Sequence, residues 1–291
     1  MELRILNYFL AVADEGSFSR AAERLHVSQP ALSQQLAAYE NEIGAKLFNR
    51  TSRHLELTEK GRLLLGRARD IVELATRTEA SLKSTDTNDL SGTLVIGAGE
   101  VTAFGHLAEA ITALRGEHPH LAFRIISGNG EDLAGGLENG TIDLALFVGP
   151  GRYEDYDYVE IPETHRWGLL LPKNNPLAEK KFITPNDLLN RPLITSRQRL
   201  VQNFLTGWLG KPISKLNIVA TYNLLYNAAH LVNAGLGSAI CIDGLIPAVF
   251  ADTLVFRPFK PILTSDAYLA WKRGTTPSPA ARALIDLLSE I

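Results

Sequence analysis

The chain has 291 residues and a net charge of -3, and 45% of its residues are hydrophobic. This length allows two domains with separate cores, and the composition excludes a disordered chain. No apolar run reaches the roughly 20 residues needed to cross a bilayer, and Met1 leads into an amphipathic pattern rather than an export signal. We therefore expect a cytoplasmic protein without a membrane partner.

Cysteine and histidine usage argue against disulfides and metal sites. Cys241 is the only cysteine, and its apolar surroundings, SAICI, favour a small buried side chain over a redox sensor. The one close histidine pair, His118 and His120, lacks the further cysteine or carboxylate partners of a metal site. We expect no metal ion and no resident cofactor.

Three short helices are predicted in the first 44 residues. The first covers residues 3–13, has an apolar stripe and ends at Gly16. The third begins near Gln29, because the Ser28 hydroxyl can cap it and Pro30 fits its first turn. The second, between them, has small and apolar residues at three- and four-residue spacing: Phe18, Ala21, Ala22 and Leu25.

The third helix has two contrasting faces. Its apolar side consists of Leu32, Leu36 and Tyr39, and its polar side begins with Gln29, Ser33 and Gln34. Two short helices joined by a tight turn, the second with a polar N-terminal face, form the geometry that places a helix end in the DNA major groove. The alternative is a helical hairpin in an enzyme core.

Residues 47–57 read as two short extended pieces around a polar, basic tip, which is a wing. An arginine at such a tip can enter the minor groove, whereas the alternative is a solvated loop. Residues 1–88 contain 12 Lys and Arg against 12 Asp and Glu. Non-specific attraction to phosphates must therefore come from a local cluster, Arg50, Arg53 and His54.

The ungapped run LxxFxxVAxxGSFSRAAxxLxVSQPALSxQLxxYExxxGxxLFxRTxRxxxLTxxG, residues 6–61, closely resembles the N-terminal winged helix-turn-helix of LysR-type transcriptional regulators. The resemblance implies a double-stranded DNA operator as partner. The candidate DNA-binding residues are Ser28, Gln29, Pro30, Ser33, Gln34, Arg50, Thr51 and Arg53. Relatives commonly carry basic residues where this chain has Ala37 and Ala38, so we expect operator affinity to depend only weakly on salt.

A long helix is predicted from Thr58, its cap, to about Lys83. Small and apolar residues recur along it at alternating spacings of four and three, as in a heptad seam. The candidate dimerisation residues are Leu64, Ala68, Ile71, Ala75 and Leu82. The alternative is a packing face within the chain; the resemblance favours a homodimer, with a homotetramer as a further expectation.

Beyond a polar hinge at residues 84–92, strand-like and helical runs alternate, which is typical of parallel sheets with crossover helices. Strands are predicted at 93–98, 123–127, 143–148, 168–171, 193–195, 217–221, 237–241 and 268–272. Helices are predicted at 107–117, 131–139, 200–209, 224–234 and 280–288. The resemblance implies a periplasmic-binding-protein-like domain whose two lobes are crossed twice by the chain.

The predicted domains are a winged helix-turn-helix at 1–58, a linker helix and hinge at 59–88, and an effector-binding domain at 89–291. Lobe I would comprise about 91–161 and 266–291, and lobe II about 162–265. Ligands of open parallel sheets bind beyond the carboxyl ends of strands, near helix N-termini. This rule selects Gly99, Glu100, Thr102, Gly128, Asn129, Phe147, Thr195, Ser196, Arg197, Tyr222 and Asn223.

Two of these residues, Arg197 and Glu100, favour ligands of opposite charge. The guanidinium of Arg197, beside two hydroxyls, suits a carboxylate or phosphate, whereas Glu100 at a helix start would repel an anion. Either the ligand has a positive or donor-rich end, or Glu100 and Arg197 form an internal pair. Both alternatives stay open.

An enzyme is not expected. The run beginning at Gly97 resembles a dinucleotide fingerprint, but its third glycine is replaced by Thr102, and no nucleophile-elbow or phosphate-loop motif is present. The alternative is a solute-binding or enzymatic α/β protein with a helical N-terminal extension. We expect a LysR-type regulator that binds operator DNA, a small-molecule effector and a second copy of itself, with RNA polymerase as a candidate partner.

Overall fold

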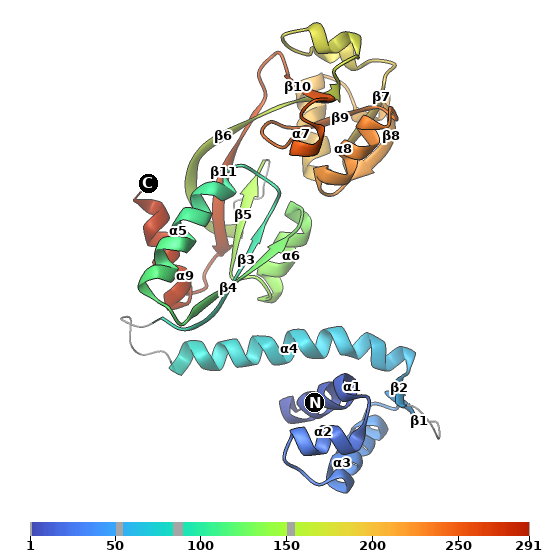
Figure 1. Ribbon diagram of the computed structural model, residues 1–291, viewed down its shortest axis with the longest axis vertical. Coiled ribbons are helices and arrows are strands. Elements are labelled where there is room, and N and C mark those ends of the chain that lie inside the picture. The colour runs from blue at the N-terminus through green and yellow to red at the C-terminus, as the bar shows by residue number, and fades with distance from the viewer. Residues whose placement is uncertain (1, 51–54, 84–89, 150–154, 291) are drawn as a thin grey trace. The chain divides into compact units, whose positions relative to one another are not determined.

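The computed structural model describes residues 2–50, 55–83, 90–149 and 155–290. The chain divides into two compact units, Met1–Lys83 and Ser84–Ile291, which are described separately below (Figure 1). Within the described ranges, no helix is both long enough and apolar enough to span a membrane.

The first unit contains the three predicted helices, a two-stranded wing and the long helix. Its elements are α1 (Leu3–Glu15), α2 (Phe18–Arg24), α3 (Gln29–Glu42), β1 (Phe48–Arg50), β2 (Leu55–Leu57) and α4 (Glu59–Lys83). Gly16 ends α1 in the left-handed conformation with φ 59°, and the hydroxyls of Ser17 and Ser28 cap α2 and α3. The local sequence signals therefore set the helix boundaries.

One core holds this unit together. Phe9, Leu6, Leu32 and Leu36 are fully buried in it, and the Phe48 ring of β1 packs at 5.4 Å from that of Phe9. The side of α3 predicted to be apolar thus faces α1 and α2, and its polar side faces outward.

In the first turns of α4, the residues of the heptad seam pack against the core of the same chain. Ala68 is 0% exposed and belongs to the core formed with α1, and Leu64 packs against the same core. Ala68 is thus covered within the chain and is not available to a second helix, because heptad spacing predicts a packing face but cannot say which helix covers it. Leu64 is only half-buried, and its place in a dimer interface stays a prediction. Ile71 is exposed and Ala75 is half-buried, and the side chain of Leu82 lies outside the described residues.

The second unit is built on a nine-stranded mixed sheet with the order β4-β3-β5-β11-β6-β9-β7-β8, in which β10 also pairs with β6. Its strands are β3 (Gly92–Ala98), β4 (Leu121–Ser127), β5 (Leu144–Val148), β6 (Tyr156–Pro172), β7 (Pro192–Ser196), β8 (Asn217–Tyr222), β9 (Ser238–Ile242), β10 (Leu254–Pro258) and β11 (Thr264–Lys272). Its helices are α5 (Phe104–Glu117), α6 (Gly130–Asn139), α7 (Arg199–Leu209), α8 (Leu225–Asn233) and α9 (Pro279–Ser289).

The double crossing is made by β6 and β11. The first part of β6 pairs antiparallel with β11, and from Trp167 onward it pairs with β9 and β10. Figure 1 shows these two strands running between the halves of the unit. We call the half with β3–β5, α5, α6 and α9 lobe I and the half with β7–β10, α7 and α8 lobe II.

Sequence periodicity predicted the parallel strands and their helices but found the antiparallel strands only in part. The first half of β6 and all of β10 were not predicted, and β11 begins four residues before the predicted strand. Each lobe has separate buried clusters on the two faces of its part of the sheet. The fold predicted here, a two-lobed α/β unit after a winged helix-turn-helix, is confirmed.

Candidate functional site

The N-terminal end of α3 presents an exposed face that is mostly polar. Ser28, Gln29, Pro30 and Gln34 are exposed and Ser33 is half-buried. The Ser28 hydroxyl accepts a hydrogen bond from the Ala31 amide at 3.4 Å, which fixes the first turn. These short polar side chains point away from the core and suit base edges and phosphates.

A buried carboxylate that sequence reasoning missed ties α3 to the wing. Glu40 is 6% exposed, and its Oε1 accepts hydrogen bonds from the backbone amides of Leu47 at 2.7 Å and Phe48 at 3.2 Å. Its Oε2 lies 3.0 Å from Lys46 Nζ. Burial raises the pKa of Glu40, but these hydrogen bonds and the Lys46 charge outweigh it and hold the pKa below its ordinary value.

The signal for Glu40 was present in the sequence as a charged residue on the buried side of α3, next to Tyr39.

The wing itself is described only in part. Arg50 ends β1 opposite Leu55, with a side chain that is not described. Thr51 and Arg53 lie outside the described residues, so their DNA contacts stay predictions.

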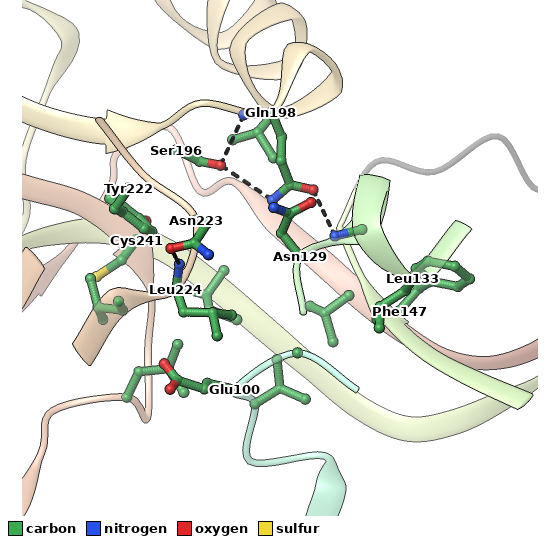
Figure 2. Close-up of a pocket in the computed structure, with 18 of the residues that line it drawn as sticks. Glu100, Asn129, Leu133, Phe147, Ser196, Gln198, Tyr222, Asn223, Leu224 and Cys241 are labelled. Atoms are coloured by element: carbon green, nitrogen blue, oxygen red, sulfur yellow. Dashed lines mark hydrogen bonds between the residues drawn. The ribbon is translucent and has the colours of Figure 1, made fainter. Parts of the chain in front are cut away.

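A pocket lies between the two lobes, with a free volume of about 110 Å³ (Figure 2). Lobe I contributes the ends of β3 and β5 and the start of α6, and lobe II contributes the ends of β7, β8 and β9 and the start of α7. Its lining is Gly99, Glu100, Val101, Asn129, Gly130, Leu133, Leu146, Phe147, Val148, Trp167, Ser196, Gln198, Val201, Tyr222, Asn223, Leu224, Leu225, Cys241, Ile242 and Leu245.

Seven of the predicted ligand residues line this pocket: Gly99, Glu100, Asn129, Phe147, Ser196, Tyr222 and Asn223. Four do not, and these predictions are corrected. Gly128 is buried below the surface, and Thr195 faces the other side of β7 from Ser196 because strand side chains alternate. Thr102 donates a hydrogen bond to Glu163 of β6, and Arg197 is turned toward Asp132.

Side chains of the opposite lobe cap the two helix starts that face the pocket. The Gly130 amide, at the start of α6, donates to Gln198 Oε1 at 2.9 Å. The Arg199 amide, at the start of α7, donates to Glu131 Oε1 at 3.2 Å. Gln198 is fixed in turn, because its Nε2 donates to Ser196 Oγ at 3.2 Å. We call these two bonds the reciprocal cap; sequence reasoning missed it because its partners are 68 residues apart.

The remaining amides at the start of α6 are capped locally. Asn129 Oδ1 accepts from the amides of Glu131 at 2.9 Å and Asp132 at 3.2 Å, and the Asp132 carboxylate accepts from the Asn129 amide in return. Asn129 is 3% exposed, and its Nδ2 has no hydrogen-bond partner among the described residues. An unused buried donor therefore lies in the pocket wall.

The pocket's charge comes from one side chain. Among the described residues that line it, Glu100 is the only charged one, and Figure 2 shows it apart from the amides of Asn129 and Gln198. Arg197 Nη2 lies 3.8 Å from Asp132 Oδ1, on an exposed surface. The arginine is thus engaged outside the pocket with a carboxylate other than Glu100.

Tyr222 and Cys241 form part of the wall rather than a reactive pair. The Tyr222 hydroxyl donates to the Ile240 carbonyl at 2.7 Å, so its proton is already in use. Burial raises the pKa of both the Tyr222 phenol and the Cys241 thiol. A thiol with a raised pKa is a poor nucleophile at neutral pH, and Cys241 is buried, as its apolar surroundings predicted.

A winged helix-turn-helix with an exposed recognition face, followed by a two-lobed α/β unit with a pocket between its lobes, defines a class of ligand-responsive DNA-binding proteins. Residues 3–62 match the model for the bacterial regulatory helix-turn-helix protein, lysR family. Residues 87–291 match the LysR substrate binding domain. The chain belongs to the LysR family of transcriptional regulators.

Individual relatives agree with this assignment. The chain is 30% identical to the Hca operon transcriptional activator HcaR of Escherichia coli, over 100% of this chain and 98% of the relative. It is 34% identical to the transcriptional regulator AlsR of Bacillus subtilis over 67% of this chain and 64% of the relative. Its fold is similar to that of full-length CbnR complexed with target DNA, with TM-score 0.69 and 23% identity, covering 100% of this chain and 99% of CbnR.

Proposed function

We propose that α3 and the wing of this regulator read operator DNA through Ser28, Gln29, Pro30, Ser33, Gln34, Arg50, Thr51 and Arg53. The carrying observation is the division of α3 into two faces: Leu32 and Leu36 are fully buried, whereas Gln29 and Gln34 are exposed and Ser33 is half-buried. A helix held in this way can enter the major groove without disturbing the core behind it.

The pocket between the lobes is the proposed effector site. Its lining includes Trp167 of β6, a strand that crosses between the lobes, and residues of both lobes. A small molecule bound there contacts both lobes, so it changes the free energy of one lobe arrangement relative to another. Coupling this change to the DNA-reading unit makes DNA affinity depend on effector concentration.

Self-association through α4 is proposed with a revised face. Leu63, Ile71 and Leu74 are exposed on this helix, whereas Ala68 is covered by the chain itself and Leu64 is half-buried against the same core. A homodimer that buries the exposed residues, with further pairing to a tetramer and RNA polymerase as a candidate partner, completes the proposal. For the domain limits we keep 1–58, 59–88 and 89–291 as functional segments, although α4 packs with the first of them.

Fluorescence anisotropy of a labelled operator duplex tests the two proposed sites together. The duplex is first obtained by selection from random sequences, and a metabolite library is then added to the complex. We expect at least one compound to change the operator dissociation constant, and the pocket-filling variant Leu245→Trp to lose that response while still binding DNA. A response that persists in Leu245→Trp would place the effector elsewhere.

Sedimentation tests the interface. We expect Ile71→Asp combined with Leu74→Asp to produce monomers, whereas Ser19→Asp, an exposed change on α2, leaves the association state unchanged. Dimers that survive the double substitution would move the interface away from this face.

A further inference from the structure

We infer that the effector of this protein is an uncharged or cationic small molecule with an apolar body, and that the pocket discriminates against carboxylates and phosphates. This inference rests on the proposed effector function of the pocket and deepens it. Two features of the wall support the charge preference, the reciprocal cap and the charge at Glu100, and the unused donor of Asn129 offers a contact for an oxygen of the ligand.

The reciprocal cap removes the donors that an anion would use. Free amides at a helix start, together with the helix dipole, attract anions. Here the Gly130 amide is bonded to Gln198 and the Arg199 amide to Glu131. An anion that displaced Gln198 would meet the Glu131 and Asp132 carboxylates at the same helix start, so the exchange is electrostatically unfavourable.

The charge of the pocket wall also disfavours an anionic ligand. Arg197, the residue that would favour an anion, is exposed and lies 3.8 Å from Asp132. Glu100 remains as the charge of the described lining. Glu100 is exposed, so water screens its charge in part, but a second carboxylate close to it is still repelled. An ammonium or amidinium group at the same place is attracted.

The polarity of the remaining wall specifies the rest of the ligand. Asn129 offers a buried N–H without a partner among the described residues, and it can donate to a carbonyl, amide or hydroxyl oxygen of a neutral ligand. Much of the remaining lining is hydrocarbon and aromatic, including Leu133, Phe147, Trp167 and Leu245. A free volume of about 110 Å³ is smaller than the roughly 150 Å³ of a cavity that binds benzene, so the ligand has at most one small ring enclosed by the wall.

Three probes of similar shape and different charge test the inference on the full-length protein: benzamide, benzylamine and benzoate. Dissociation constants are measured by ligand-detected NMR, and pocket binding is defined as the part lost in Leu245→Trp. We expect benzamide or benzylamine to bind in the pocket at least about tenfold more tightly than benzoate. We also expect Glu100→Gln combined with Gln198→Ala to reduce that ratio toward one, whereas Glu117→Gln, a matched charge removal at the far end of α5, leaves it unchanged.

The possible failures are distinguishable. Benzoate that binds in the wild-type pocket as tightly as benzamide and benzylamine would overturn the inference and leave the pocket as an effector site. A ratio unchanged in Glu100→Gln with Gln198→Ala would also overturn it, because the selectivity would then have another origin. If no probe binds in the pocket of the wild type or of the Glu100→Gln, Gln198→Ala variant, the proposed effector function of this pocket fails, and the inference fails with it.

Discussion

The starts of α3 and α6 are chemically alike but structurally opposite. Ser28 caps the first turn of α3, and Asn129 caps that of α6. The residues around the start of α3 are exposed, whereas the first amide of α6 is bonded to Gln198 from the other lobe. A helix start is therefore a potential anion site only where the fold leaves its amides uncovered. In this chain the start of α3 is exposed to solvent, whereas the first amide of α6 is already hydrogen-bonded.

The contrast matches the two partners. A DNA groove presents phosphates and base edges, which suit exposed amides and short polar side chains. Among the described residues, the pocket presents one carboxylate, one unused amide donor and a mostly apolar lining, which the inference above assigns to a neutral or cationic molecule. Four predictions test whether the two sites are built as differently as they look.

The largest expected effect comes from disturbing the frame that holds α3. A Cβ added at Gly61 would lie far inside contact distance of the Leu47 carbonyl oxygen and 2.9 Å from Leu57 Cδ2. We expect Gly61→Ala to destabilise the first unit by about 2–4 kcal/mol and abolish operator binding. Gly66→Ala is the matched control on the same helix, since nothing lies within 4 Å of its Cβ position. Equal unfolding midpoints for the two variants would contradict this packing.

Glu40 provides the next test. Glu40→Gln should cost about 1–3 kcal/mol at neutral pH, because a charged acceptor of two backbone amides is lost. The folded-state pKa of Glu40 is lowered, so its contribution is fully present above the unfolded value near 4.5 and disappears as the pH falls through the lower folded value. Urea denaturation between pH 7 and pH 3 checks this. Wild type and variant should converge in stability at the acid end, and a constant difference would contradict the assignment.

Base reading by α3 is the third test. Gln29→Ala and Gln34→Ala should each reduce discrimination between operator and random duplex by about 1–3 kcal/mol. Gln35→Ala, the neighbouring exposed glutamine, is the control and should leave discrimination unchanged. Competition binding measures the ratio directly, and an unchanged sequence preference in Gln34→Ala would refute its base-reading role.

The smallest effect concerns salt. Ala37 and Ala38 stand where basic residues would contact phosphates, and residues 1–88 balance 12 positive against 12 negative groups. The slope of log affinity against log salt should therefore be shallower than the roughly -5 expected for six phosphate contacts. Ala38→Lys, at an exposed position of α3, should steepen it by about 1. A wild-type slope of -5 or steeper would contradict the prediction.

The two sites also differ in how far sequence could predict them. The elements of the DNA-reading unit follow from local signals: apolar spacing in α1–α3, the caps at Ser17 and Ser28, and glycine at 16. The role of Glu40 was not predicted, because the amides that donate to it, those of Leu47 and Phe48, come close only once the chain has turned after α3.

The pocket was predictable only in outline. The strand-end rule selected Gly99, Asn129, Phe147 and Ser196, which all line the pocket, because parallel strands place their carboxyl ends on one edge; their contact with an effector stays a prediction. The orientation of Arg197 toward Asp132, and the pairing of Gly130 with Gln198, depend on contacts between segments far apart in the chain. The local sequence placed both Arg197 and Glu100 near the predicted ligand site, but it could not show which of the two charges faces the ligand.

Selection of duplexes from a random pool by the purified full-length protein tests the central claim most directly. We predict that sequencing will show enrichment of a defined site, and that the triple variant Gln29→Ala, Ser33→Ala and Gln34→Ala, folded by circular dichroism, will lose it. A pool that stays random with the wild-type protein, or the same enrichment with the triple variant, would contradict the claim that the exposed start of α3 reads DNA.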